Sequence, residues 1–262
     1  MNQVTRAILA LLIILAFMPV GGLAASTPAP EITTTAVIDG QAVDLDLTHT
    51  SDGMVDRYTL SEPVVTNEYQ ITSLEVEYKQ HPYIAYGIAI IDTGAPSTFS
   101  FAFSEPAELT YCLMASSSMS MSTTDGGNDG VTVTAVAPPS GIFEDIDGIT
   151  EVQVSTASDG QNRINLRADL GGPLFHTLKQ SDTWGPFEEG MSPCPDFSAD
   201  KWNSMRIDVN FLASGGGDAI TLNGRSSTEG NDMVCPEFPA LFLPAVACIG
   251  MLCAVMLVRI KK

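Results

Sequence analysis

The chain has 262 residues, which is enough for one ordinary domain or a large β-sandwich whose core needs no disulfide to form. It is strongly acidic: 30 of its 31 Asp and Glu but only eight of its 12 Lys and Arg lie between Ala25 and Cys235, which gives that region a net charge of −22. Such a surface repels phosphate backbones and argues against nucleic-acid binding. It suits an exposed exterior, where acidity keeps a protein soluble or attracts divalent cations diffusely.

The first 24 residues have the features of a secretory signal peptide. Arg6 precedes the apolar stretch 7–18, which is too short to span a bilayer comfortably, and small residues follow at Gly22 and Ala24. We expect cleavage after Ala24. The alternative is an uncleaved anchor, which Pro19 disfavours because it shortens any helix there.

Residues 25–223 show alternating apolar and polar positions, broken by turn-rich segments, and little helical periodicity. This pattern predicts an all-β ectodomain, a sandwich or a jelly roll. Phe99, Phe101 and Phe103 alternate with small residues, so their rings are expected on one core-facing side. The expected strands are 34–38, 42–47, 57–60, 69–79, 83–91, 98–104, 109–115, 131–137, 151–155, 163–168, 205–213 and 219–222.

The segment from Ile90 to Ala95 contains Asp92-Thr-Gly94, which resembles the active-site loop of aspartic proteases. In such enzymes two loops each supply an Asp, and the pair shares one proton. This chain has one such loop, so a dimer would have to provide the second. A hairpin turn at Gly94 and Pro96 explains the same residues, and we expect a protein that is not an enzyme.

Asp125, Asn128 and Asp129 offer hard oxygen ligands for calcium, and a second acidic loop follows at 143–148. The first loop has no bidentate Glu at the EF-hand spacing, and Asp-Gly sequences are also ordinary hairpin turns. Calcium is therefore the one candidate cofactor.

Surface glycans are a candidate class of partner, because aromatic rings stack well on sugar rings. Trp184 lies in an expected loop and is the aromatic residue that we expect to be most exposed. The other aromatic residues considered for this role are Tyr83, Tyr86, Phe187 and Trp202.

Cys112 and Cys194 are the two cysteines of the expected ectodomain. In an exported protein they predict one disulfide, or two free thiols if the surroundings are anoxic. No Cys/His cluster with zinc-ligand spacing is present in the sequence.

The last part of the chain predicts a membrane anchor. Residues 224–235 are polar and form an expected stalk, and residues 238–258 are an uncharged run of 21 residues. As a helix this run would be about 30 Å long, the thickness of a hydrocarbon core. Arg259, Lys261 and Lys262 follow and would remain in the cytoplasm as a stop-transfer signal.

Pro236, Glu237, Phe238 and Pro239, followed by the apolar run and the basic end, resemble the PEF-CTERM signal, an archaeal relative of bacterial PEP-CTERM tails. The resemblance covers residues 236–262. It implies that an archaeosortase-type membrane transpeptidase cuts near the motif and transfers the protein to another anchor. A plain single-pass anchor is the alternative. Either way we expect a cell-surface or extracellular-matrix protein.

Overall fold

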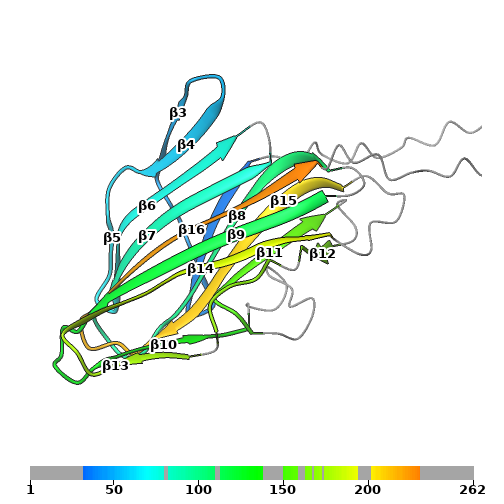
Figure 1. Ribbon diagram of the computed structural model, residues 1–262. Coiled ribbons are helices and arrows are strands. Elements are labelled where there is room, and N and C mark those ends of the chain that lie inside the picture. The colour runs from blue at the N-terminus through cyan, green and yellow to red at the C-terminus, as the bar shows by residue number, and fades with distance from the viewer. Residues whose placement is uncertain are drawn as a thin grey trace, which may run out of the picture.

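Two antiparallel sheets packed face to face make up the described part of the chain in a computed structural model (Figure 1). The described residues are 32–79, 82–109, 113–137, 150–158, 163–166, 168–172, 174–193 and 202–230. Their regular structure consists of strands. The predicted all-β class is therefore confirmed.

The first sheet has eight strands, and six of them form a continuous order. That order is β12 (Arg163–Asn165), β11 (Gln153–Ser158), β15 (Trp202–Ala213), β8 (Thr98–Leu109), β1 (Thr33–Ile38) and β2 (Gln41–Val43). The remaining two are β10 (Val131–Ala135), which pairs with β15, and β13 (Leu174–Thr177), which pairs with β10.

The second sheet also has eight strands. Its order is β14 (Ser181–Pro193), β9 (Leu113–Thr124), β16 (Asp218–Gly230), β7 (Tyr83–Asp92), β6 (Tyr69–Lys79), β4 (Val55–Leu60) and β3 (Leu47–Ser51), with β5 (Val64–Val65) paired to β6.

The core lies between the inner faces of the two sheets. Phe99, Phe101 and Phe103 on β8 are fully buried, as their alternation predicts. Phe103 stacks on Tyr86 of the opposite sheet with ring centroids 5.2 Å apart. Aromatic contacts of this kind join the sheets into one sandwich-like unit.

Several predicted strands have different bounds in the structure. Strand β6 has the expected bounds, whereas the expected strand 109–115 corresponds to the end of β8 at Leu109 and the start of β9 at Leu113. Strands β3, β5, β13 and β14 were not predicted. Strand β16 continues to Gly230, so residues 224–230 of the expected stalk are a paired strand of the second sheet.

Strand β16 finishes at one end of the sandwich, on the right in Figure 1, whereas β1 begins about midway along β8. Thr33 pairs with Ser104 in the middle of β8, and Gly230 pairs with Leu113 at the start of β9. The turns at 92–98, 125–130 and 214–218 lie at the opposite end. Strand β16 has 13 residues, so the two ends are about 40 Å apart.

None of the described segments forms a helix with the length and apolar character that crossing a bilayer requires. The expected signal peptide with Ala24, the membrane run 238–258, the sorting motif and the basic end all lie outside the described residues, as do Cys112, Cys194 and the loop 143–148.

Candidate functional site

Three carboxylates converge at the end of the sandwich that is remote from Gly230, the last residue of β16. The carboxylate oxygens of Asp125, Asp129 and Asp218 lie within 4.8 Å of one another. Asp218 begins β16, and Asp125 directly follows β9. Strands β9 and β16 are paired, with Ala219 opposite Thr124. The pairing therefore brings Asp125 and Asp218 together, where β9 ends and β16 begins.

Asp125 shapes the turn in which it lies. Its Oδ1 accepts a hydrogen bond from the backbone N–H of Asn128 at 2.6 Å, and its Oδ2 accepts one from Gly130 at 2.9 Å. Asn128 has a φ of 62°, a conformation that Asn tolerates. The structure thus brings the predicted ligands Asp125 and Asp129 together. The third predicted ligand, Asn128, lies in the same turn, where its N–H binds Asp125.

A glycine-rich loop packs against this turn. Gly215, Gly216 and Gly217 all have positive φ, which a side chain would strain. A Cβ added to Gly126 would collide with the carbonyl oxygen of Gly217. The two loops are therefore in backbone contact, and only glycine allows them to approach so closely.

Asp218 is the buried member of the group, with 0% of its surface exposed. Burial raises the pKa of its carboxyl, and the nearby Asp125 and Asp129 raise it further. Ser214 Oγ donates to its Oδ2 at 2.5 Å, and the Gly126 N–H donates to its Oδ1 at 3.3 Å; both bonds lower the pKa. The carboxylate is held in place but lies close to other negative charge.

Asp92 adds to this buried acidity. It lies opposite Asp218 in the β7–β16 pairing and is also 0% exposed. Burial raises its pKa, opposed by hydrogen bonds from the Ser97 N–H at 3.0 Å and Ser97 Oγ at 3.2 Å. Ionised carboxylates at this depth are unfavourable unless a cation compensates them.

The donor set fits a hard divalent cation. Calcium takes six to eight oxygen ligands, from carboxylates, backbone carbonyls and water. Asp125, Asp129 and Asp218 would supply three carboxylates, and the absence of His and Cys from this group disfavours zinc. The sequence did not identify Asp218, because the run Gly215–Asp218 reads as an ordinary turn.

The segment 92–97 is the turn between β7 and β8. The N–H groups of Thr93 and Gly94 both donate to the carbonyl oxygen of Glu68, at 2.8 and 2.9 Å. Asp92 and Asp218 are adjacent, but their full burial denies a peptide substrate access to either carboxylate. Among the described residues, these two Asp side chains do not form an open catalytic dyad.

The aromatic residues considered for sugar stacking are mostly turned inward. Trp184 and Phe187 pack on Phe175, with centroids 5.7 Å away in both pairs. Trp184 is half-buried and lies in strand β14 rather than in the expected loop, and its ring packs against the core. Tyr86 and Trp202 are buried, whereas Tyr83 lies on the outer face of the second sheet.

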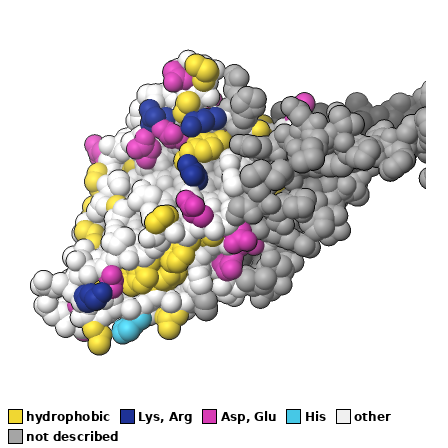
Figure 2. All heavy atoms as spheres, viewed as in Figure 1, with side chains coloured by type: hydrophobic (Ala, Val, Ile, Leu, Met, Phe, Trp, Pro, Cys, Tyr) yellow, Lys and Arg dark blue, Asp and Glu magenta, His cyan; other side chains and the backbone are white. Residues whose placement is uncertain are grey.

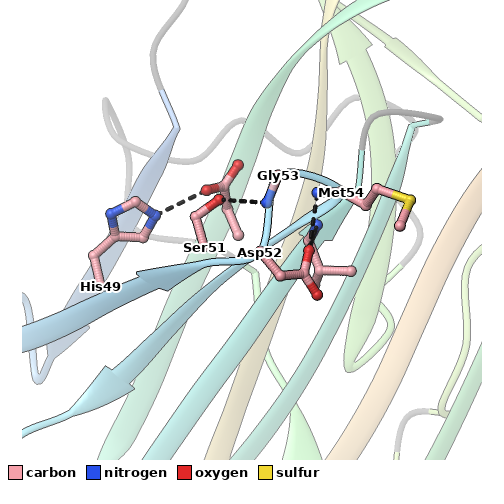
Figure 3. Close-up of polar contacts among 7 residues, drawn as sticks. His49, Ser51, Asp52, Gly53 and Met54 are labelled. Atoms are coloured by element: carbon pink, nitrogen blue, oxygen red, sulfur yellow. Dashed lines mark hydrogen bonds and ion pairs between the residues drawn. The ribbon is translucent and has the colours of Figure 1, made fainter.

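The hairpin of β3 and β4 carries a local polar network, shown in Figure 3. Asp52 Oδ1 accepts from the N–H groups of Met54 at 2.9 Å and Val55 at 2.8 Å. His49 Nε2 lies 2.9 Å from Asp56 Oδ1. These contacts close an exposed turn and define no binding site.

Together these features define the class of the protein: an acidic, sandwich-like all-β protein with a carboxylate cluster at the end of the sandwich where β16 begins. No protein-family model matches the sequence, and no curated protein matches it significantly. Its function must therefore be inferred from its own residues.

Proposed function

We propose that this chain is an exported, non-enzymatic cell-surface or extracellular-matrix protein that is processed and anchored through its C-terminal tail. The observation that carries the proposal is the order of three features in the tail. A Pro-Glu-Phe-Pro motif at 236–239 is followed by an uncharged run of bilayer length and then by Arg259, Lys261 and Lys262.

The proposal includes two terminal helices that flank the sandwich-like ectodomain. The first belongs to a signal peptide that is removed after Ala24. The second spans the membrane from 238 to 258 until an archaeosortase-type transpeptidase cuts near Pro236 and attaches the protein to its final anchor. The membrane and this enzyme are the proposed partners.

The fold supports this arrangement. Strand β16 ends at Gly230, six residues before the Pro236 of the motif, so the proposed tail follows directly from this end of the sandwich. The carboxylate cluster lies about 40 Å away along β16. An anchor at the tail would therefore present the acidic end outward.

Mass spectrometry of the mature protein from its native cells tests the proposal. We expect an N-terminus at Ala25 and a C-terminus near 236–239 that carries an added group. Replacing Glu237→Gln should block this processing, whereas Glu229→Gln, outside the motif, should leave it unchanged. Recovery of the soluble full-length chain from the cytosol with Met1 intact would contradict the proposal. An exported chain that retains residues 240–262 would show a plain single-pass anchor.

Calcium binding at the carboxylate cluster is a second candidate function. It is favoured by the convergence of Asp125 and Asp129 with the buried Asp218, which adds a third carboxylate from a distant part of the chain. We infer that calcium binds there and stabilises the outward end, since compensation of buried charge favours the folded state.

Thermal unfolding with and without calcium tests this second function. At a concentration about 100 times the Kd, one bound ion should stabilise the fold by about 2.7 kcal/mol. Asp129→Asn removes an exposed carboxylate and should abolish the increase in Tm, whereas Asp44→Asn, in an exposed loop outside the cluster, should retain it. An unchanged Tm for the wild type, with no heat in a calorimetric titration, would exclude the site.

A further inference from the structure

A shallow groove of about 310 Å³ crosses the outer face of the second sheet. Strands β7, β16 and β9 form its floor, and Pro186 of β14 lines one side. Its volume is at the lower end of the range for small-molecule sites. Figure 2 shows this face: neutral polar side chains and backbone occupy its middle, and several charged side chains gather toward β4 and β6.

Around Arg225 and Asn223, the outward side chains on the floor of the groove are small. Ala85, Ser118 and Ser120 line it from β7 and β9. Gly87 has no side chain, and a Cβ there would lie 3.2 Å from Asn223 Oδ1. A planar or chair-shaped ring can therefore approach the sheet closely, within reach of the serine hydroxyls and the Asn223 amide.

Arg225 projects from the middle of this floor and is exposed. Of the six Lys and Arg residues in the described ranges, it is the one whose side chain has neither a carboxylate nor an aromatic partner there. The other five are engaged: Arg57 with Glu75 and Glu77, Lys79 with the Tyr83 ring, Lys179 with Asp182, and Arg163 and Arg206 with Asp208.

The register of the sheet keeps the neighbours of Arg225 neutral. Ser118 lies opposite it on β9 and Ala85 on β7. Glu188 is one strand further on one side, and Glu77, which binds Arg57, is one strand further on the other. In an acidic protein, the guanidinium is thus free to bind an anion, a group that it can contact with two parallel hydrogen bonds.

Tyr83 places an aromatic ring at the same groove. The ammonium of Lys79 lies 4.0 Å from the ring centroid. Lys79 comes from β6, on the side of β7 away from β16, whereas the groove lies over β7, β16 and β9. The Tyr83 N–H donates to buried Glu105 at 2.6 Å, which fixes the start of the strand. Because Tyr83 lines the groove, its ring forms an apolar side of an otherwise polar groove.

We propose that this groove binds a sugar ring that carries a carboxylate, such as a uronic-acid unit of a polysaccharide. Arg225 binds the carboxylate in a bidentate pair. Asn223 and the serines hydrogen-bond the ring hydroxyls, and Tyr83 packs on the apolar C–H face of the sugar. Sugar binding at this groove does not depend on how the chain is anchored or on calcium at the far end.

The proposal combines two requirements, a carboxylate and a ring, and three probes separate them. NMR titration of the full chain with galacturonate, galactose and acetate compares both groups together with each alone. We expect galacturonate to bind at least tenfold more tightly than galactose or acetate. Equal binding of galactose would overturn the role of the carboxylate, and equal binding of acetate would overturn the role of the ring.

Variants then assign the site. Arg225→Gln should weaken galacturonate binding at least tenfold, and Arg225→Lys should restore only part of it, because lysine cannot form the bidentate pair. Arg57→Gln is the matched control, since Arg57 is exposed on the same face but paired, and it should leave the affinity unchanged. No binding by the wild type, or equal losses in Arg225→Gln and Arg57→Gln, would overturn the proposal.

Discussion

Gly224 of β16 lies close to Gln153, which belongs to β11 of the opposite sheet. A Cβ there would overlap Gln153 Oε1 and the Tyr86 ring and hydroxyl. Tyr86 Oη donates to Gln153 Oε1 at 2.7 Å, and Gln153 Nε2 donates to the Arg225 carbonyl at 3.2 Å. The missing side chain thus makes room for a buried hydrogen-bond network between the sheets.

Gly224→Ala should therefore destabilise the fold. Overpacking of a filled core costs about 1–3 kcal/mol, and loss of the Tyr86–Gln153 bond would add to this. Gly172→Ala is the control, because a Cβ there meets no atom within 4 Å. Urea unfolding of both variants measures the difference, and equal stabilities would show that the network tolerates the extra carbon.

Glu105 is a buried carboxyl whose titration should be visible in the stability of the protein. Burial raises its pKa from 4.5 to about 8, opposed by the hydrogen bond from the Tyr83 N–H. The folded state therefore keeps a proton that the unfolded chain loses above about pH 4.5. Its contribution to stability is complete below that pH and is lost as the pH rises to about 8.

Replacing Glu105 with a residue that cannot ionise should make the free energy of unfolding less dependent on pH. Glu105→Gln should show a smaller fall in the free energy of unfolding between about pH 5 and pH 8 than the wild type. Glu108→Gln, an exposed position on the same strand, should retain the wild-type slope. If Glu105→Gln and the wild type had the same slope, the carboxyl would titrate normally in the folded protein.

At the scale of the element, the β3–β4 hairpin depends on its turn more than on its burial. Most of its side chains are exposed or half-buried, and β3 is an edge strand of the second sheet. Asp52 caps the turn, and its two backbone hydrogen bonds lower the pKa of its carboxyl. A lowered pKa means that the cap contributes above the unfolded pKa and is lost as the pH falls through the folded value.

Asp52→Ala should loosen this hairpin locally. We expect faster hydrogen exchange at Met54 and Val55, with little change in the global Tm, because exposed hairpins open independently of the core. Asp44→Ala, in an exposed segment before the hairpin, is the control. Unchanged exchange at Met54 would show that strand pairing alone holds the turn.

The elements also show what the sequence can and cannot predict. Strand β6 was predicted with its observed bounds, because its polar and apolar residues largely alternate between two clear turns. Strand β14 was missed, because Gly185, Pro186 and two glutamates interrupt any such pattern, and its pairing with β9 shifts register between Trp184 and Phe187. Strand β14 forms because it pairs with β9, and its own sequence pattern does not predict it.

The candidate sites follow the same rule. Asp125 and Asp129 were predicted as ligands because they lie in one short turn. Asp218 lies 92 residues after Gly126 in the sequence, and only strand pairing brings it to this turn. The groove at Arg225 has no local motif at all. It arises from the register of β7, β16 and β9, which a single sequence does not specify.

At the scale of the whole molecule, the excess of negative charge should oppose compaction. The chain carries a net charge of −19, and most of its acids lie in the part that folds into the sandwich. Self-repulsion of like charges destabilises a compact state, and salt screens it: the Debye length falls from about 30 Å at 0.01 M to about 8 Å at 0.15 M.

The Tm of the full chain at pH 7 should therefore rise when NaCl is increased from about 10 mM to about 150 mM. The rise should disappear near pH 4.2, the isoelectric point of the sequence, where the net charge vanishes. Choline chloride should act as well as NaCl, because screening does not depend on the identity of the cation. A rise in Tm that occurs with NaCl alone would instead indicate a bound sodium ion. A Tm that neither salt changes at pH 7 would show that the acidic side chains are too well separated to repel one another.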